Sequence, residues 1–195
     1  MAEMKQIKPR VVAVVGAKGA GKDELADYLV QEYGVLAVEV GEFARKLARD
    51  ANKDEPLCYD VSAKNLAKYG PEHVMQQLVA EILENEQRAP QALLIMGVRT
   101  PAEAAVLKAN FGSDLLLVYV KVGDQATRYE RVQKRDFATD SGDFEKFVQE
   151  DEQLKSDYGM ATTADLADII LWNQGSLPAY HQQIKTHIVS YLFPK

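Results

Sequence analysis

Residues 16–23 read Gly-Ala-Lys-Gly-Ala-Gly-Lys-Asp and directly follow the apolar run Val-Val-Ala-Val-Val at 11–15. This is the pattern of a phosphate-binding loop, G-x-x-x-x-G-K-S/T, with Asp in place of Ser or Thr at the last position. The glycines let the backbone curl so that successive amides point at one phosphate group, and a helix beginning near Lys22 adds its positive dipole end. The alternative is a glycine-rich turn that binds nothing. Because strand, loop and helical pattern follow one another in register, the sequence predicts a site for a nucleoside triphosphate.

The donor nucleotide, which we take to be ATP, is expected to contact every residue of this loop: Gly16, Ala17, Lys18, Gly19, Ala20, Gly21, Lys22 and Asp23. Lys22 can reach the β- and γ-phosphates and is the first candidate catalytic residue. Asp23 stands where a hydroxyl would bind Mg²⁺, and a carboxylate is also a good ligand for that ion. The sequence therefore predicts ATP and Mg²⁺ as cofactors, with Asp23 as the metal ligand. As an alternative, Asp23 is only a favourable charge in the first turn of a helix.

Apolar runs alternate with helical patterns along the whole chain. Strands are predicted at 11–15, 35–40, 92–96, 114–121 and 168–172, and helices at 23–33, from 41, and at 63–69, 71–87, 101–111, 124–135, 144–158 and 176–191. Asp124 is expected to cap its helix, and 51–62 is expected to be a loop. This alternation predicts an α/β protein with a five-stranded, mostly parallel sheet covered by helices on both faces. We expect one domain over 1–195, with an acceptor-binding helical region at about 41–88 and a small lid at about 128–160.

Composition narrows the function classes. The formal net charge of −6 argues against broad binding to nucleic acids or membrane surfaces. Cys58 is the single cysteine, so no disulfide framework or cysteine-based metal site is expected. The N-terminal residues are polar, and no apolar stretch approaches the length that spans a bilayer. These features predict a cytoplasmic protein that acts on small molecules, and they give no oligomeric state.

Two arginines follow strands of the predicted sheet. Arg45 lies one helical turn after the second strand, in Gly-Glu-Phe-Ala-Arg, and Arg99 follows the third strand, in Gly-Val-Arg-Thr-Pro. Ligands of such sheets collect beyond the carboxyl ends of the strands, so both side chains should face the same crevice as the phosphate loop. Guanidinium groups make paired hydrogen bonds to phosphate, which suits an anionic acceptor. The alternative is two surface arginines in solvent.

A second arginine group lies on one predicted helix. Arg128, Arg131 and Arg135 are spaced by three and four residues, share one face, and lead into the polar segment 136–143. Mobile arginines that close over the moving phosphoryl group would neutralise its charge and exclude water. We therefore predict all three as catalytic lid residues. The alternative is a solvated helix face with Glu130 as an ionic partner.

The segment after the last predicted strand reads Asn-Gln-Gly-Ser from Asn173, which is a turn pattern that can line an adenine pocket. We count Asn173 among the nucleotide-binding candidates and expect Trp172 to belong to the core. The third strand ends in Met96, at a position where nucleotide enzymes with such a phosphate-binding loop commonly have an Asp that helps hold Mg²⁺. Methionine cannot do this, so either Asp23 organises the metal alone or turnover is weak.

Taken together, these segments resemble the nucleoside monophosphate kinase group of P-loop proteins, and the three-layer P-loop NTPase fold is the fold this implies. The likeness is narrower to an archaeal family described as adenylate-kinase-related or dephospho-CoA-kinase-like. It is carried by 68–72, 97–103, 128–131, 147–152 and 167–170, together with Asn173 and Gly175. Two positions depart from the family's pattern, because Met96 replaces an Asp and Ala67 stands where an Arg is frequent.

The resemblance implies a phosphotransferase that uses ATP and Mg²⁺ and acts on a nucleotide-like acceptor held by Arg45 and Arg99. One alternative is a dephospho-CoA kinase, whose acceptor is a ribose hydroxyl and which would need a general base, expected among the acidic residues of 42–60. Another is a nucleotide-binding switch or assembly protein with weak ATPase activity, which Met96 favours and the arginines disfavour.

Overall fold

The computed structural model describes residues 9–51, 69–84, 91–134 and 143–194. Within these ranges, five strands form one sheet in the order β2-β3-β1-β4-β5, and every neighbouring pair is parallel. The strands are β1 (Arg10–Val15), β2 (Leu36–Glu39), β3 (Ala92–Val98), β4 (Leu115–Lys121) and β5 (Ile169–Trp172). The predicted α/β class and the parallel sheet are confirmed.

The central strand explains the first apolar run of the sequence. β1 pairs with β3 on one side and β4 on the other, and its residues from Val11 to Val15 are fully buried. A parallel strand with helices on both faces needs apolar side chains on both sides, which is why no polar residue alternates here.

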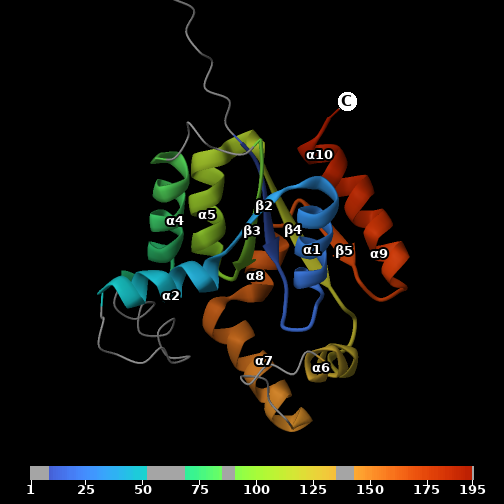
Figure 1. The fold of residues 1–195 in the computed structure, drawn as a ribbon. Coiled ribbons are helices and arrows are strands. Elements are labelled where there is room, and N and C mark those ends of the chain that lie inside the picture. Colours follow the sequence, from blue (N-terminus) through green and yellow to red (C-terminus); the bar gives the residue numbers. More distant parts are fainter. Residues whose placement is uncertain (1–8, 52–68, 85–90, 135–142, 195) are drawn as a thin grey trace, which may run out of the picture.

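Helices cover both faces of the sheet, giving three layers (Figure 1). One face packs against α1 (Lys22–Tyr33), α9 (Leu177–Ile184) and the short α10 (Ser190–Leu192). The other face packs against α2 (Val40–Ala51), α4 (His73–Glu84), α5 (Pro101–Phe111) and α8 (Met160–Asp165). The remaining two, α6 (Gln125–Gln133) and α7 (Phe144–Tyr158), lie beyond the end of the sheet where the loop between β1 and α1 is found (Figure 1). None of the described helices has the length and apolar character to cross a membrane.

Some details differ from the sequence-based expectations. The helix predicted at 176–191 is divided into α9, a π-helical stretch (Lys185–Val189) and α10, and α8 was not predicted. Trp172 was expected in the core, but it is 45% exposed and carries the Lys121 ammonium 4.6 Å from its ring centroid. Because β5 is an edge strand, only Leu171 of its last three residues is buried. Cys58, Ala67, Arg135, most of the expected loop at 51–62 and most of the expected helix at 63–69 lie outside the described residues.

Candidate active site

The phosphate-binding loop has the conformation that its glycines predicted. β1 ends at Val15 and α1 begins at Lys22, and Gly19 and Gly21 between them have φ angles of 76° and 97°. Residues other than glycine rarely adopt such φ angles. There is also no room for a side chain at Gly19, because a Cβ there would lie 2.4 Å from the Arg128 carbonyl oxygen. Both backbone conformation and close packing therefore require glycine at position 19.

Three side chains from distant parts of the chain hold the carbonyl groups of this loop. The Asn173 amide donates to the carbonyl oxygen of Ala20 at 2.9 Å, and the Tyr180 hydroxyl donates to that of Gly21 at 3.1 Å. The Arg128 guanidinium donates to the carbonyl oxygen of Lys18 at 3.1 Å. In a trans peptide the C=O and the following N–H point in opposite directions, so anchoring these carbonyls turns the next amides the other way. A row of backbone amides turned to one side is an anion-binding arrangement.

Lys22 lies within this curl, since its ammonium group donates to the carbonyl oxygen of Ala17 at 3.0 Å. Asn173 is only 8% exposed and contacts the loop backbone, a contact that the turn pattern did not indicate. Burial also raises the pKa of the Tyr180 phenol, which therefore stays protonated and keeps its bond to the loop.

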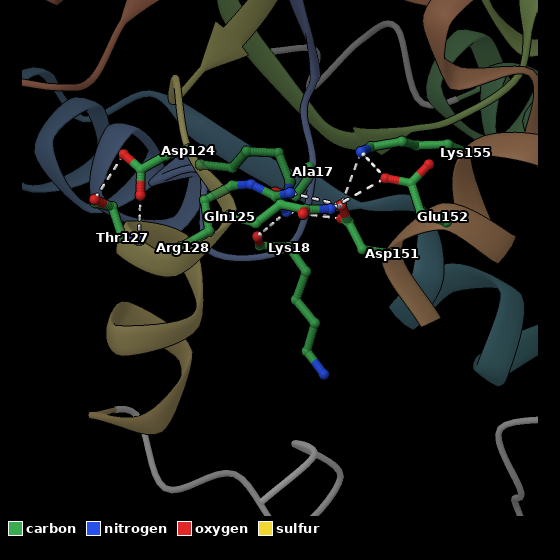
Figure 2. A network of polar contacts seen from close by, with 10 residues as sticks. Ala17, Lys18, Asp124, Gln125, Thr127, Arg128, Asp151, Glu152 and Lys155 are labelled. Atoms are coloured by element: carbon green, nitrogen blue, oxygen red, sulfur yellow. Dashed lines mark hydrogen bonds and ion pairs between the residues drawn. The ribbon is translucent and has the colours of Figure 1, made fainter. Parts of the chain in front are cut away.

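The arginine face of α6 is turned toward this loop. Arg128 makes two bonds to Asp151 of α7, Nη1 to Oδ1 at 2.7 Å and Nη2 to Oδ2 at 2.5 Å, and both side chains are at most 5% exposed (Figure 2). Arg131 donates through Nη2 to the Asn173 carbonyl oxygen at 2.9 Å, and its Nη1 atom is buried with no hydrogen-bond partner among the described residues. The alternative of a solvated face is therefore wrong for Arg128. The lid role that we predicted for these arginines stays a prediction.

Further polar side chains surround Asp151 (Figure 2). The Lys155 ammonium lies 2.9 Å from Asp151 and 2.8 Å from Glu152, and the Gln125 amide donates to Asp151 at 3.3 Å. Burial alone would raise the pKa of Asp151, but the hydrogen bonds from Arg128 and Lys155 outweigh it and hold that pKa below its ordinary value. The carboxylate is therefore ionised at neutral pH. Asp151 falls in the segment 147–152 that carries the family resemblance, but no role was predicted for it, because nothing local marks an acidic residue on a helix as a partner of the loop.

A cleft opens between this network and the loop. Its walls include the following residues of the loop, the end of β4, α6 and α7: Ala17, Ala20, Val120, Gly123, Asp124, Gln125, Arg128 and Lys155. Asp124 is the N-cap of α6 as predicted, and its side chain accepts a hydrogen bond from the Thr127 amide at 2.6 Å.

A second cleft opens between α2, the start of α4, the end of β3, the start of α5 and the end of α7. Arg99 lines it, and Arg45 points to the same place: a Cβ on Gly41 would lie 3.5 Å from an Arg45 nitrogen and 3.8 Å from an Arg99 nitrogen. The structure therefore brings the two arginines together as predicted, but in a cleft separate from the one beside the phosphate-binding loop, where the strand-end argument had placed them. The carboxylate of Glu39, at the end of β2, is 3.4 Å from the same point.

Local sequence explains how Arg99 is positioned. Gly97 has a φ of 84° and lies in a β-bulge: Val14 pairs with Met96 and Val15 with Val98, so Gly97 is left without a partner residue in β1. Thr100 is the N-cap of α5 and forms a capping box with Glu103. The Glu103 carboxylate also accepts a hydrogen bond from the Arg99 amide at 2.7 Å. This cap holds the Arg99 backbone in place at the wall of the cleft.

Two residues from later in the chain complete the position of Arg99. The guanidinium lies 5.4 Å from the ring centroid of Tyr158, the last residue of α7, and the Thr163 hydroxyl donates to the Arg99 carbonyl oxygen at 2.9 Å. Sequence reasoning missed both, since their contacts arise only when α7 and α8 fold against the start of α5. Burial raises the pKa of the Glu103 carboxyl, although the amides of Thr100 and Arg99 offset part of the effect.

The residues present are compatible with a magnesium ion that arrives with ATP. Asp23 is exposed in the first turn of α1, directly after Lys22. Among the described residues, no group of three or more His, Cys, Asp and Glu side chains could hold a metal by itself. Mg²⁺ in such sites is commonly held by one or two carboxylates and by the phosphates, so one exposed carboxylate suffices. Met96 is 6% exposed and offers no ligand of that kind.

No protein-family model matches the chain. It is 28% identical over 177 residues to a UPF0200 protein of Halobacterium salinarum, covering 90% of each chain. It is 27% identical over 186 residues to a UPF0200 protein of Pyrococcus abyssi, covering 94% of this chain and 97% of that one. Among solved structures, a sugar kinase from Janibacter superposes with a TM-score of 0.59 at 15% identity, over 92% of this chain and 94% of that one. Shikimate kinase from Acinetobacter baumannii superposes with a TM-score of 0.52 at 15% identity, over 94% and 95%.

The chain has the P-loop kinase fold. These structural likenesses cover nearly the whole chain, so the fold assignment includes both clefts and not only the phosphate-binding loop.

Proposed function

We propose that this chain is a phosphotransferase that uses ATP and Mg²⁺ and transfers the γ-phosphoryl group to a nucleoside or deoxynucleoside monophosphate. The observation that carries the proposal is the pairing of an anchored phosphate-binding loop with a separate cleft where Arg45 and Arg99 meet. Both lie beyond the carboxyl ends of strands of one sheet, where ligands of such folds bind. A protein that only binds nucleotide has no need for the second, cationic cleft.

The residues divide between the two substrates. The loop from Gly16 to Lys22 would cradle the donor phosphates, with Lys22 at the β- and γ-phosphates and Asp23 as a ligand of Mg²⁺, which supplies further charge neutralisation when bound. Arg45 and Arg99 would hold the acceptor phosphate. An oxygen of that phosphate attacks the γ-phosphorus, the bond to the β–γ bridging oxygen breaks, and ADP leaves. Alignment and charge neutralisation are sufficient for such a transfer.

In this proposal, Arg128 and Arg131 do not close over the phosphates as a lid. They would instead hold the loop and its surroundings, because Arg128 bonds the Lys18 carbonyl oxygen and Asp151, and Arg131 bonds the Asn173 carbonyl oxygen. Arg135 lies outside the described residues, and its closure over the phosphates remains a prediction from helical spacing.

A second candidate is transfer to a hydroxyl, as in a dephospho-CoA kinase. Glu39 supports it, because its carboxylate lies beside the point where the arginines meet and could accept the hydroxyl proton. The sequence had suggested a base within 42–60. Glu42 of that segment is exposed, and residues 52–60 are not among those described.

The test is a titration of the protein with ATP and Mg²⁺, followed by an ADP-release assay against nucleoside monophosphates, deoxynucleoside monophosphates and dephospho-CoA. ADP release that depends on one monophosphate supports the proposal and names the acceptor. Release with dephospho-CoA alone moves the assignment to the second candidate. ATP binding without acceptor-dependent release contradicts both and favours a nucleotide switch, and Met96→Asp would then test whether the missing carboxylate limits turnover.

A further inference from the structure

We infer that Asp151 is a positioning residue that keeps the phosphate-binding loop in its anion-binding shape by holding Arg128 against it. The inference rests on the proposed nucleotide binding and goes beyond it, because Asp151 belongs to α7 and is separate from the loop itself. Asp151 would touch neither substrate and would act only through the Arg128 guanidinium.

The first step is the contact between α6 and the loop. Arg128 touches the loop twice, through its backbone carbonyl packed at Gly19 and through the hydrogen bond from its guanidinium to the Lys18 carbonyl oxygen at 3.1 Å. The amide that follows the Lys18 carbonyl in the chain belongs to Gly19. Since the C=O and N–H of one peptide point in opposite directions, the Arg128 bond sets the direction of the Gly19 amide.

The second step is the cost of the buried charge. The Arg128 side chain is only 5% exposed, and a cation so removed from water stays in place only when a counter-charge compensates it. Asp151 supplies that charge through two parallel hydrogen bonds, which also fix the plane of the guanidinium. If the carboxylate becomes neutral, the guanidinium gains by turning toward water, and its bond to the Lys18 carbonyl is lost.

Two other residues of α7, Glu152 and Tyr158, allow the effect of the ion pair to be distinguished from the effect of packing α7 against the protein. Glu152 is the next residue on the same helix and takes part in the same network, but its carboxylate bonds Lys155 and Gln125, whereas the Arg128 guanidinium bonds Asp151 (Figure 2). Tyr158 ends the same helix beside Arg99 in the other cleft. Glu152 therefore serves as a control beside the ion pair, and Tyr158 as a control in the acceptor cleft.

The experiment compares the wild type with Asp151→Asn, Glu152→Gln and Tyr158→Leu. Binding of ATP with Mg²⁺ is measured by calorimetry, the melting temperature by circular dichroism, and amide hydrogen exchange in the loop by mass spectrometry. We expect Asp151→Asn to weaken ATP binding about tenfold or more and to speed exchange in the loop, as loss of a charge-assisted hydrogen bond implies. Glu152→Gln should bind ATP with about the wild-type affinity, because it leaves the Arg128 bonds intact. Tyr158→Leu should raise the acceptor KM and leave ATP binding unchanged.

A double variant keeps the inference testable if Asp151→Asn does not fold. Replacing both charges, as in Arg128→Met with Asp151→Leu, leaves no unpaired ion in the interior and is often tolerated. This variant should fold and still bind ATP weakly. A folded Asp151→Asn or double variant with wild-type affinity for ATP and wild-type exchange in the loop would overturn the inference alone. A wild type that does not bind ATP would overturn the proposed function, and this inference with it.

Discussion

The two clefts at the end of the sheet are built in different ways. The loop that would bind the donor is held by buried side chains that come from 110, 153 and 159 residues away in the chain. In the acceptor cleft, Arg99 is positioned mainly by its neighbours in sequence, which form a glycine bulge and a capping box. Arg45, the other arginine of this cleft, is exposed on α2. The donor site is therefore fixed by tertiary structure, and the acceptor site is set mainly by local structure, with two further contacts to Arg99 from Tyr158 and Thr163.

This difference has a physical consequence. A buried ion pair and buried hydrogen bonds leave the loop few alternative conformations, which suits a constant ligand such as a triphosphate. The exposed Arg45 side chain keeps more rotamer freedom, which suits acceptors that differ in shape. Changes to the buried residues that hold the donor loop should therefore affect binding and stability together, whereas changes to the two arginine side chains of the acceptor cleft should affect mainly kinetics.

The largest effect is expected for Lys22→Ala. Loss of a preorganised cation at the point where charge develops typically lowers kcat by about 10²–10³-fold, and we expect at least that loss here. ADP release at saturating acceptor measures it. Lys46→Ala is the matched control, since that lysine lies in α2 and forms an exposed pair at 3.1 Å with Glu81 of α4. Equal losses in both variants would contradict a specific role for Lys22.

The next effect concerns stability. Breaking a buried ion pair by removing one partner costs roughly 3–5 kcal/mol, so Asp151→Ala should lower the free energy of unfolding by about that amount at pH 7. Urea denaturation followed by circular dichroism measures it. A loss below about 1 kcal/mol would mean that the Arg128–Asp151 pair contributes no more than an ordinary surface ion pair. That result would contradict the proposed difference in rigidity between the two sites.

The same carboxylate predicts a pH dependence. The pKa of Asp151 is lowered from an ordinary 3.8, so its contribution to stability is complete well above pH 3.8 and is lost as the pH falls through the lowered value. The difference in unfolding free energy between the wild type and Asp151→Asn should therefore stay constant at neutral pH and shrink only in strong acid. A difference that already disappears near pH 6 would contradict this origin.

On the acceptor side, Arg99→Ala and Arg45→Ala should raise the acceptor KM by roughly 10–100-fold, the worth of a charge-assisted hydrogen bond. The melting temperature and the KM for ATP should stay near wild type. Arg99→Lys should recover little, because an ammonium neither forms the planar fork nor stacks on Tyr158 in the same way. A large change in the KM for ATP would show that the two clefts are not independent.

The smallest effects concern Glu103. Glu103→Ala leaves the buried amides of Arg99 and Thr100 without their acceptor and should cost about 1–3 kcal/mol in unfolding free energy. Glu103→Gln keeps an acceptor oxygen and should be close to wild type at neutral pH. Because burial raises the pKa of Glu103 above its ordinary 4.5, the neutral form stabilises the fold below that pH, and this advantage is lost as the pH rises through the raised value. Urea denaturation at pH 4 and pH 7 should show this trend in the wild type and not in Glu103→Gln.

The sequence predicted what local pattern controls. The strands, the phosphate-binding loop, the Asp124 cap and the meeting of Arg45 with Arg99 all follow from apolar runs, glycine spacing and the geometry of parallel sheets. Partners that depend on how helices pack could not be read in this way. Asp151 and Tyr158 sit in an ordinary amphipathic helix, and Trp172 was misplaced because the sequence does not say which strand lies at the edge.

Steady-state ADP release, with ATP and a monophosphate acceptor varied independently, decides whether the two clefts serve one phosphoryl transfer; it is measured for the wild type, Lys22→Ala and Arg99→Ala. We expect release by the wild type only when both substrates are present, loss of turnover in Lys22→Ala, and a raised acceptor KM with unchanged KM for ATP in Arg99→Ala. Release that ignores the acceptor, or an Arg99→Ala variant indistinguishable from the wild type, would contradict this expectation.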